Sequence, residues 1–194
     1  SIAMSSNWAD FIKSDPTFSY LSSWHYVNFK SGLTQKEFVA TLEADTAIDA
    51  YTKAIELDDN MAEAFNNRAA IYARLKQFDK AIADCDRATN LNPNDYLAWR
   101  NLGLARHDHG ELDQAASDYD ESIRINGRSA ETYHYRGNVF LDRKQWTRAL
   151  EDFDQAILLD ENMSAAWLSR AITLARLGRA EEAEESRAKA QKLG

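Results

Sequence analysis

The chain has 194 residues and a formal net charge of −8, and 44% of its residues are hydrophobic while 28% are charged. This composition is typical of a soluble globular protein that can bury a core, and it excludes a disordered chain. The negative charge argues against nucleic acid as the main partner, because phosphate binding needs a basic surface. One cysteine, Cys85, excludes an internal disulfide framework.

Membrane insertion and secretion are not indicated by the sequence. No apolar run approaches the roughly 20 residues that a membrane-spanning helix needs. The first residues lack the basic start and the apolar stretch of a signal peptide. We therefore expect no membrane contact, and a cytoplasmic location is favoured.

Residues 1–46 form an N-terminal segment that is rich in aromatic side chains. Eight of them lie within the first 38 positions, about twice the density of the whole chain: Trp8, Phe11, Phe18, Tyr20, Trp24, Tyr26, Phe29 and Phe38. We expect this segment to act as a cap that covers the apolar face of the helix that follows it, because aromatic side chains bury a large area. A single helix is expected over Gln35–Leu57, since Thr34 and Glu37 have the spacing of a capping box.

Two short motifs in this segment, Trp8-Ala9-Asp10 and Trp24-His25-Tyr26, resemble part of the zinc-dependent, single-strand-preferring nuclease family. The resemblance implies that Asp10 and His25 correspond to zinc ligands of that family. The chain has only four histidines and none of the family's later motifs, and two ligands cannot close a tetrahedral zinc site. We therefore interpret the segment as a nuclease-like fragment, and we predict no metal site, no cofactor and no catalytic residue.

From residue 47 onward the sequence repeats with a period of 34 residues, which is the signature of a repeat architecture. Three columns of residues show this period: alanine at Ala47, Ala81, Ala115, Ala149 and Ala183; a ring at Phe65, Trp99, Tyr133 and Trp167; and a small residue at Ala69, Gly103, Gly137 and Ala171. Each unit has the pattern of two amphipathic helices that cross closely at the small residues. Asp79, Asp113 and Thr147 are expected to cap the second helices.

The period and the motif Trp99-x-x-Leu102-Gly103 resemble the tetratricopeptide repeat family over about residues 46–194. The resemblance implies an all-α, right-handed solenoid of helix pairs. We expect an orphan second helix of a first repeat at 47–61, because Ser31 and Gln35 do not fit the columns of a preceding first helix. Repeats are then expected at 62–95, 96–129, 130–163 and 164–194, the last with a polar capping helix.

The resemblance also implies that the first helix of each repeat lines a concave groove that binds a protein or peptide. The positions that the family uses in its groove correspond here to Asn66, Arg74, Arg100, His107, Asp108, His134, Asn138 and Asp142. We therefore expect a non-catalytic adaptor or scaffold. Some family members clamp the C-terminal carboxylate of chaperones, but only Asn101 among the five matching positions agrees with that clamp, which disfavours this ligand.

Two other hypotheses stay open at this point. One is a zinc nuclease remnant fused to repeats, and the other is a structural repeat protein that associates with itself through its N-terminal end. Other chemical sites are disfavoured. His107 and His109 would point to different sides of a helix, Cys85 occupies a packing column, and Trp99 and Trp167 belong to the ring column of the core.

Overall fold

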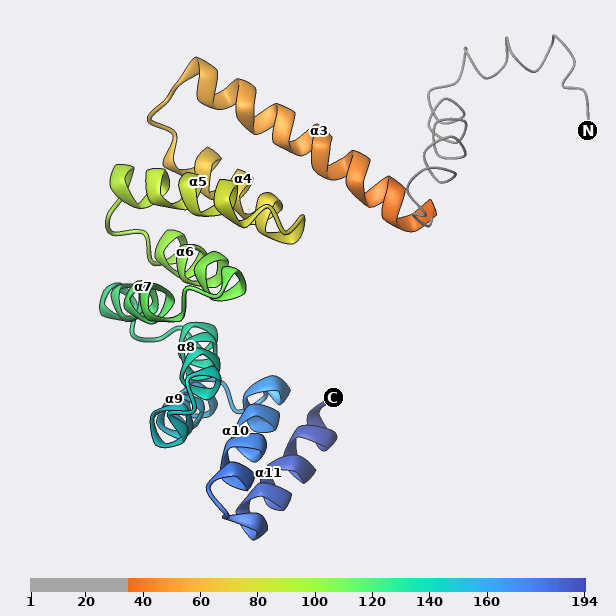
Figure 1. Ribbon diagram of the computed structural model, residues 1–194, viewed down its shortest axis with the longest axis vertical. Helices are drawn as coiled ribbons and strands as arrows, with labels where there is room; N and C mark the ends of the chain where they lie inside the picture. The colour runs from red at the N-terminus through yellow and green to blue at the C-terminus, as the bar shows by residue number, and fades with distance from the viewer. Residues whose placement is uncertain (1–34) are drawn as a thin grey trace, which may run out of the picture. The chain divides into compact units, whose positions relative to one another are not determined.

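The structure is a computed structural model that describes residues 35–194, with side chains from residue 43 onward. Within this range every regular element is an α-helix (Figure 1). The helix α3 is followed by four pairs: α3 (Gln35–Leu57); α4 (Ala62–Arg74) and α5 (Phe78–Leu91); α6 (Tyr96–His109) and α7 (Leu112–Ile125); α8 (Ala130–Asp142) and α9 (Trp146–Leu159); α10 (Ser164–Arg176) and α11 (Ala180–Leu193). The predicted all-α repeat solenoid is confirmed, and the single helix predicted over 35–57 has these bounds.

Two compact units divide the chain, and the boundary between them falls between Ala50 and Tyr51, inside α3. The candidate zinc ligands Asp10 and His25 lie outside the described residues. So does most of the N-terminal segment that was predicted to act as a cap, and its role stays a prediction.

The described part of α3 has the exposure expected of a second helix without its first helix. Tyr51 and Ala54 are only half-buried. In the same columns of complete repeats, Tyr119 and Ala88 are 0% exposed. An apolar face that later repeats bury completely is therefore covered only in part on α3.

The second helices begin two residues earlier than predicted. Their first residues are Phe78, Leu112 and Trp146, so Asp79, Asp113 and Thr147 lie in the first turn and do not cap these helices. Side-chain caps occur instead on two first helices: Asp95 accepts from the Leu97 backbone N–H, and Ser129 accepts from that of Thr132. The prediction of these caps was wrong because a large apolar side chain already occupies the first helical position in each case, and Asp79, Asp113 or Thr147 follows it inside the helix.

The turns between repeats share one hydrogen bond from a backbone N–H to a side-chain oxygen two residues earlier. The donor and acceptor residues are Asn60 and Asp58, Asn94 and Asn92, Arg128 and Asn126, and Asn162 and Asp160. Asn and Asp favour turns because they can make this local bond. At two of the turns an indole N–H adds a second bond: Trp99 donates to the Pro93 carbonyl and Trp167 to the Glu161 carbonyl, both at 2.9 Å. The ring column therefore holds the turns as well as filling the core.

Within a repeat the two helices approach closely because a glycine faces an aromatic ring. A Cβ atom added to Gly103 would lie 2.8 Å from the Tyr119 ring, and one added to Gly137 would lie 2.6 Å from the Phe153 ring. Both rings are 0% exposed and have little room to move. The repeat at 62–95 has an alanine, Ala69, in this column, and its partner there is the small Cys85. A large ring on the second helix is thus matched to a glycine on the first helix, and a smaller side chain on the second helix is matched to an alanine.

Half-buried arginines of the first helices connect each repeat to the one before it. Arg136 donates to Asp152 of its own second helix at 2.7 Å and to Asp120 of the preceding second helix at 2.6 Å. Arg68 makes the corresponding bonds to Asp84 of its own second helix and to Thr52 of the preceding one. Arg170 does the same with Ser186 and Asp154. Each of these arginines therefore bonds two second helices, 16 residues ahead and 16 residues behind.

In the repeat at 96–129 an arginine at a different position of the first helix connects the second helix of its own repeat with the preceding one. Its arginine column holds Leu102, and Arg106, one turn later, donates to Asp118 at 2.8 Å and to Asp86 at 3.0 Å. Glu111 lies 3.8 Å from the same guanidinium, so three carboxylates share one cation. Burial raises the pKa of Asp118 to about 6, although Arg106 favours its charged form.

The matched sizes of Gly103 and Tyr119 lead to a prediction about coupling. Gly103→Ala should lower the free energy of unfolding in the wild type, because overpacking costs about 1–3 kcal/mol. In a Tyr119→Cys background the ring is gone, and the same change should stabilise by up to about 1 kcal/mol, the helix propensity gain of alanine. Urea unfolding of the four proteins measures this coupling. Equal effects of Gly103→Ala in both backgrounds would contradict it.

The pKa of Asp118 leads to a prediction about pH. Its folded value of about 6 lies above the ordinary 3.8, so between these values the folded chain keeps a proton that the unfolded chain has lost. This contribution to stability is complete only below the unfolded pKa of 3.8 and is lost as the pH rises through about 6. We expect the wild type to lose stability relative to Asp118→Asn over this window, as measured by urea unfolding at a series of pH values.

The comparison with Asp118→Asn removes the effect of His134, which has the opposite sign. Burial lowers the pKa of His134, so its contribution to stability grows as the pH rises. His134 is present in both proteins and cancels in the difference. Parallel stability curves for the two proteins between pH 4 and 6 would refute the raised pKa.

Candidate functional site

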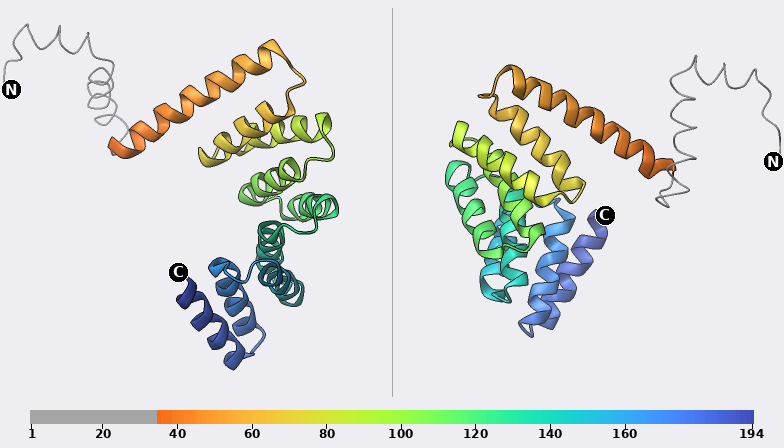
Figure 2. Two further views of the ribbon diagram at one scale, coloured as in Figure 1. Left: turned by 180° about the vertical axis from the view of Figure 1, so that it is seen from behind. Right: turned by 45° about the horizontal axis from the view of Figure 1, so that its top comes forward.

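The first helices of the repeats lie on the inner side of a curved stack. Helices α4, α6, α8 and α10 contact one another in sequence, whereas none of the second helices α5, α7, α9 and α11 contacts the next one. A stack whose layers are closer on one side bends toward that side. Figure 1 shows α6 and α8 inside α7 and α9, and Figure 2 shows the same arrangement from behind. The surface of the first helices is therefore the concave one.

Two of the predicted site residues are used to hold neighbouring first helices together. The Asn101 side-chain amide donates to the Asn66 side-chain oxygen at 2.9 Å, and His134 Nε2 lies 3.1 Å from Ser169 Oγ. Both pairs join residues 35 positions apart, on consecutive first helices. Asn66 is 8% exposed and His134 is 9% exposed. They build the inner surface and present little of themselves to a ligand.

Three further predicted residues take part in contacts across the inner surface. His107 Nε2 lies 2.7 Å from Asp142 Oδ2, which joins α6 to α8 in an exposed pair. The side-chain oxygen of Asn138 accepts a bond of 3.4 Å from the Ser169 hydroxyl. The structure thus brings His107 and Asp142 together, which their spacing along the sequence did not indicate.

The remaining predicted residues, Arg74, Arg100 and Asp108, take no part in such contacts. Arg74 and Asp108 are exposed and Arg100 is half-buried. None of the three makes a hydrogen bond or an ion pair with another residue of the described chain. Two arginines and one aspartate on neighbouring helices α4 and α6 can bind carboxylates, backbone amides and carbonyl groups.

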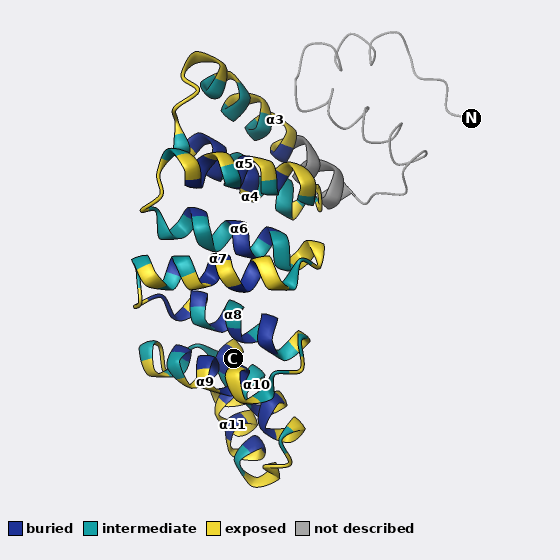
Figure 3. Ribbon diagram, turned by 60° about the vertical axis from the view of Figure 1, so that its left-hand side comes forward, coloured by how far each residue is buried: buried dark blue, intermediate teal, exposed yellow. Residues whose placement is uncertain are grey.

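Figure 3 shows how burial is distributed over the stack, with buried residues between the paired helices and exposed ones along the outer faces. On α11 the positions that correspond to Ile82, Cys85 and Thr89 of an earlier repeat hold Glu184, Arg187 and Gln191, and all three are exposed. Glu184 and Arg187 form an ion pair at 2.7 Å. The last helix therefore presents polar side chains at these positions, and its role as a capping helix stays a prediction.

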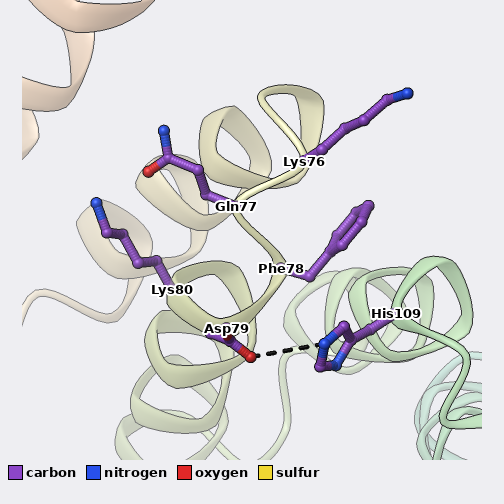
Figure 4. Close-up of a pocket in the computed structure, with 6 residues that line it drawn as sticks. All are labelled: Lys76, Gln77, Phe78, Asp79, Lys80 and His109. Atoms are coloured by element: carbon purple, nitrogen blue, oxygen red, sulfur yellow. Dashed lines mark ion pairs between the residues drawn. The ribbon is translucent and has the colours of Figure 1, made fainter.

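A pocket at the edge of the stack is separate from the inner surface. It is lined by Lys76, Gln77, Phe78, Asp79, Lys80 and His109 (Figure 4). Asp79 Oδ1 lies 3.6 Å from His109 Nε2, while the two lysine side chains point away from this pair. One repeat later Asp113 and Arg143 make the equivalent ion pair at 2.8 Å. The pocket therefore surrounds an ion pair between repeats, and its polar groups do not converge on a ligand.

The other residues that could carry chemistry are occupied by packing. Cys85 is buried, and burial raises the pKa of its thiol to about 12, so it carries no nucleophilic thiolate at neutral pH. Among residues 43–194 no three His, Cys, Asp or Glu side chains are grouped so that they could hold a metal ion. Searched over the same part of the chain, no helix is both long and apolar enough to cross a membrane.

These features define a helical-repeat protein with an open inner surface. One tetratricopeptide repeat model matches residues 62–95, and a second matches residues 86–130 and 136–193. The chain belongs to the tetratricopeptide repeat family. The same comparisons do not support the resemblance of residues 7–46 to zinc nucleases.

Solved structures with the same fold include MamA, with a TM-score of 0.73 at 22% identity over 83% of this chain and 95% of that chain. Another is YrrB, described as a TPR protein with an unusual peptide-binding site, with a TM-score of 0.66 at 23% identity over 75% of each chain. Identities this low show a shared fold alone.

Curated relatives match shorter segments. The Hsp70-Hsp90 organizing protein of Triticum aestivum is 50% identical over 44 residues, which are 23% of this chain and 8% of that protein. The small glutamine-rich tetratricopeptide repeat-containing protein 2 of Mycosarcoma maydis is 44% identical over 59 residues, which are 30% of this chain and 17% of that protein. The matches thus span less than a fifth of either relative.

Proposed function

We propose that this chain is a non-catalytic adaptor that binds a protein or peptide on the inner surface of its first helices. The observation that carries the proposal is the set of charged side chains there, Arg74, Arg100 and Asp108, which no described residue pairs. Charged side chains without a partner in the chain can make charge-assisted hydrogen bonds to a ligand, and these three lie on the neighbouring first helices α4 and α6. A ligand lying across α4 and α6 would supply the missing partners.

The rest of the inner surface is well suited to support such a ligand. The bonds from Asn101 to Asn66 and from His134 to Ser169 hold consecutive first helices at a set distance. The free groups are therefore presented by a preorganised surface, which lowers the entropy lost on binding. The exposed pair of His107 and Asp142 extends the polar surface from α6 to α8.

The relatives support a protein or peptide as the ligand and leave its identity open. Two of them are described by their names as an organizing protein of chaperones and as a repeat-containing protein, and a structural neighbour is described as peptide-binding. We do not propose the chaperone carboxylate clamp for this chain. Asn101, the one residue that agrees with that clamp, uses its side-chain amide to bond Asn66.

Reversing the free charges tests this proposal. Peptides selected from a random display library on the immobilised wild type provide the ligand, and fluorescence polarisation measures their affinity. The double variant Arg74→Glu and Arg100→Glu should bind them at least about tenfold more weakly, because hydrogen bonds to charged groups contribute about 1.5–3 kcal/mol each and 1.4 kcal/mol is a factor of ten.

A matched control is Arg124→Glu on α7. Arg124 is an exposed arginine that pairs with Glu121 and lies on a second helix, away from the inner surface. This control should retain wild-type affinity. If the double variant also retains it, with unchanged helical content, recognition does not use the inner surface and the proposal is wrong.

A further inference from the structure

Helix α10 carries a stripe of exposed apolar side chains on one face. Its members are Ala165, Leu168, Ile172 and Ala175, all of them exposed, with Leu168 at 48% and Ile172 at 42%. Steps of three, four and three residues place them along one line of the helix, the spacing of the contact seam between two packed helices. This line lies on the first helix of the last repeat, and α10 is the one first helix of residues 62–176 whose four positions are all apolar; the same columns on α6, for example, hold Arg100 and His107 beside Leu97 and Leu104.

The equivalent positions on earlier first helices show what normally covers this face. Leu168 occupies the column of Asn66, Arg100 and His134; Asn66 and His134 are buried and bond the next first helix, and Arg100 is half-buried. A further repeat of the same kind does not fit next to α10. Its first helix would also have to pack against α11, whose facing positions are the exposed, charged Glu184 and Arg187. The occupant of the stripe must therefore contact α10 without needing an apolar α11.

The stripe has a two-fold symmetric pattern. Counted from position 170, Leu168 and Ile172 lie two residues to either side, and Ala165 and Ala175 lie five residues to either side. In an antiparallel pair of such helices, each large side chain meets a large one and each alanine meets an alanine. Small residues at both ends also let the helix backbones approach closely. A surface that is complementary to itself in this way is typical of a contact between identical chains related by a two-fold axis.

The charges beside the stripe favour the same arrangement. Glu161 is exposed just before α10 begins, and Arg176 is exposed at its last residue. Arg176 makes no ion pair with any other described residue. Antiparallel pairing brings Glu161 of one copy near Arg176 of the other, whereas parallel pairing would bring like charges together.

We propose that the stripe on α10 binds the same stripe of a second copy in antiparallel orientation, which makes this chain a reversible dimer. The contact is one helix face and is small by the standard of specific interfaces, so the dimer is weak. The proposal is independent of the proposed function, which rests on Arg74, Arg100 and Asp108 of α4 and α6.

Sedimentation equilibrium of the full chain, from low micromolar to near-millimolar concentration, tests for the dimer. The wild type should show a reversible monomer–dimer equilibrium. Leu168→Glu and Ile172→Glu should each reduce association at least tenfold, because every substitution appears twice in a two-fold contact. The matched control is Leu158→Glu on α9, since Leu158 is 77% exposed and lies outside the stripe. It should associate like the wild type, and so should the double variant Arg74→Glu and Arg100→Glu.

Cysteine cross-linking tests the orientation. Residues 165 and 175 of one helix are about 15 Å apart, too far for an internal disulfide. In the antiparallel dimer, position 165 of one copy faces position 175 of the other. The double variant Ala165→Cys and Ala175→Cys should therefore oxidise to a covalent dimer, while each single variant should not. The native Cys85 is buried and does not interfere.

Three results would overturn the proposal. The first is a strictly monomeric wild type at the highest concentration, which would leave the stripe to a helix of another protein. The second is association that persists in both glutamate variants, which would place the contact elsewhere, for example at the N-terminal end. The third is a covalent dimer formed by a single cysteine variant, which would show that like positions face each other. Circular dichroism of every variant confirms that the helices remain folded.

Discussion

The close approach of two helices within each repeat is the constraint on which the rest of this structure depends. Where Gly103 faces Tyr119 and Gly137 faces Phe153, a missing side chain on one helix makes room for a ring on the other. The rings then fill the space between the helices without a void, as native packing density requires. Because this match sets the distance between first and second helices, it also sets how the pairs stack and which helices form the inner surface.

The hydrogen bonds of the arginines, which we call the arginine ties, fix how each repeat is aligned with the one before it. Each guanidinium meets acceptors on two second helices, and removing either acceptor would leave a buried charge with less compensation. Buried ion pairs of this kind contribute little net stability, but they disfavour a slipped arrangement in which the charges do not meet. The inner surface depends on this register, since the bonds from Asn101 to Asn66 and from His134 to Ser169 form only when consecutive first helices are aligned.

Much of the fold could be predicted because the helices are local and the period is regular. The columns of Ala81, Phe65 and Ala69 placed the helix pairs, and the capping-box spacing of Thr34 and Glu37 predicted the start of α3. The arginine ties were missed although Arg68, Arg136 and Arg170 share one column, because the acceptors lie 16 residues away on other helices. For the site, spacing could assign residues to the inner surface. Spacing could not show which of these side chains pair with one another, because residues 35 positions apart come into contact only through the stacking of consecutive repeats.

The arginine ties have a consequence for how such an array can change in length. Every first helix contributes a donor, and the second helices α5, α7 and α9 offer an acidic acceptor both to their own repeat and to the next one: Asp84 and Asp86, Asp118 and Asp120, and Asp152 and Asp154. An arginine therefore bonds an aspartate of the preceding repeat at each boundary between these repeats. A gene that duplicated or lost one whole unit of 34 codons in the interior of the array would join compatible ends, and no buried charge would be stranded at the new junction.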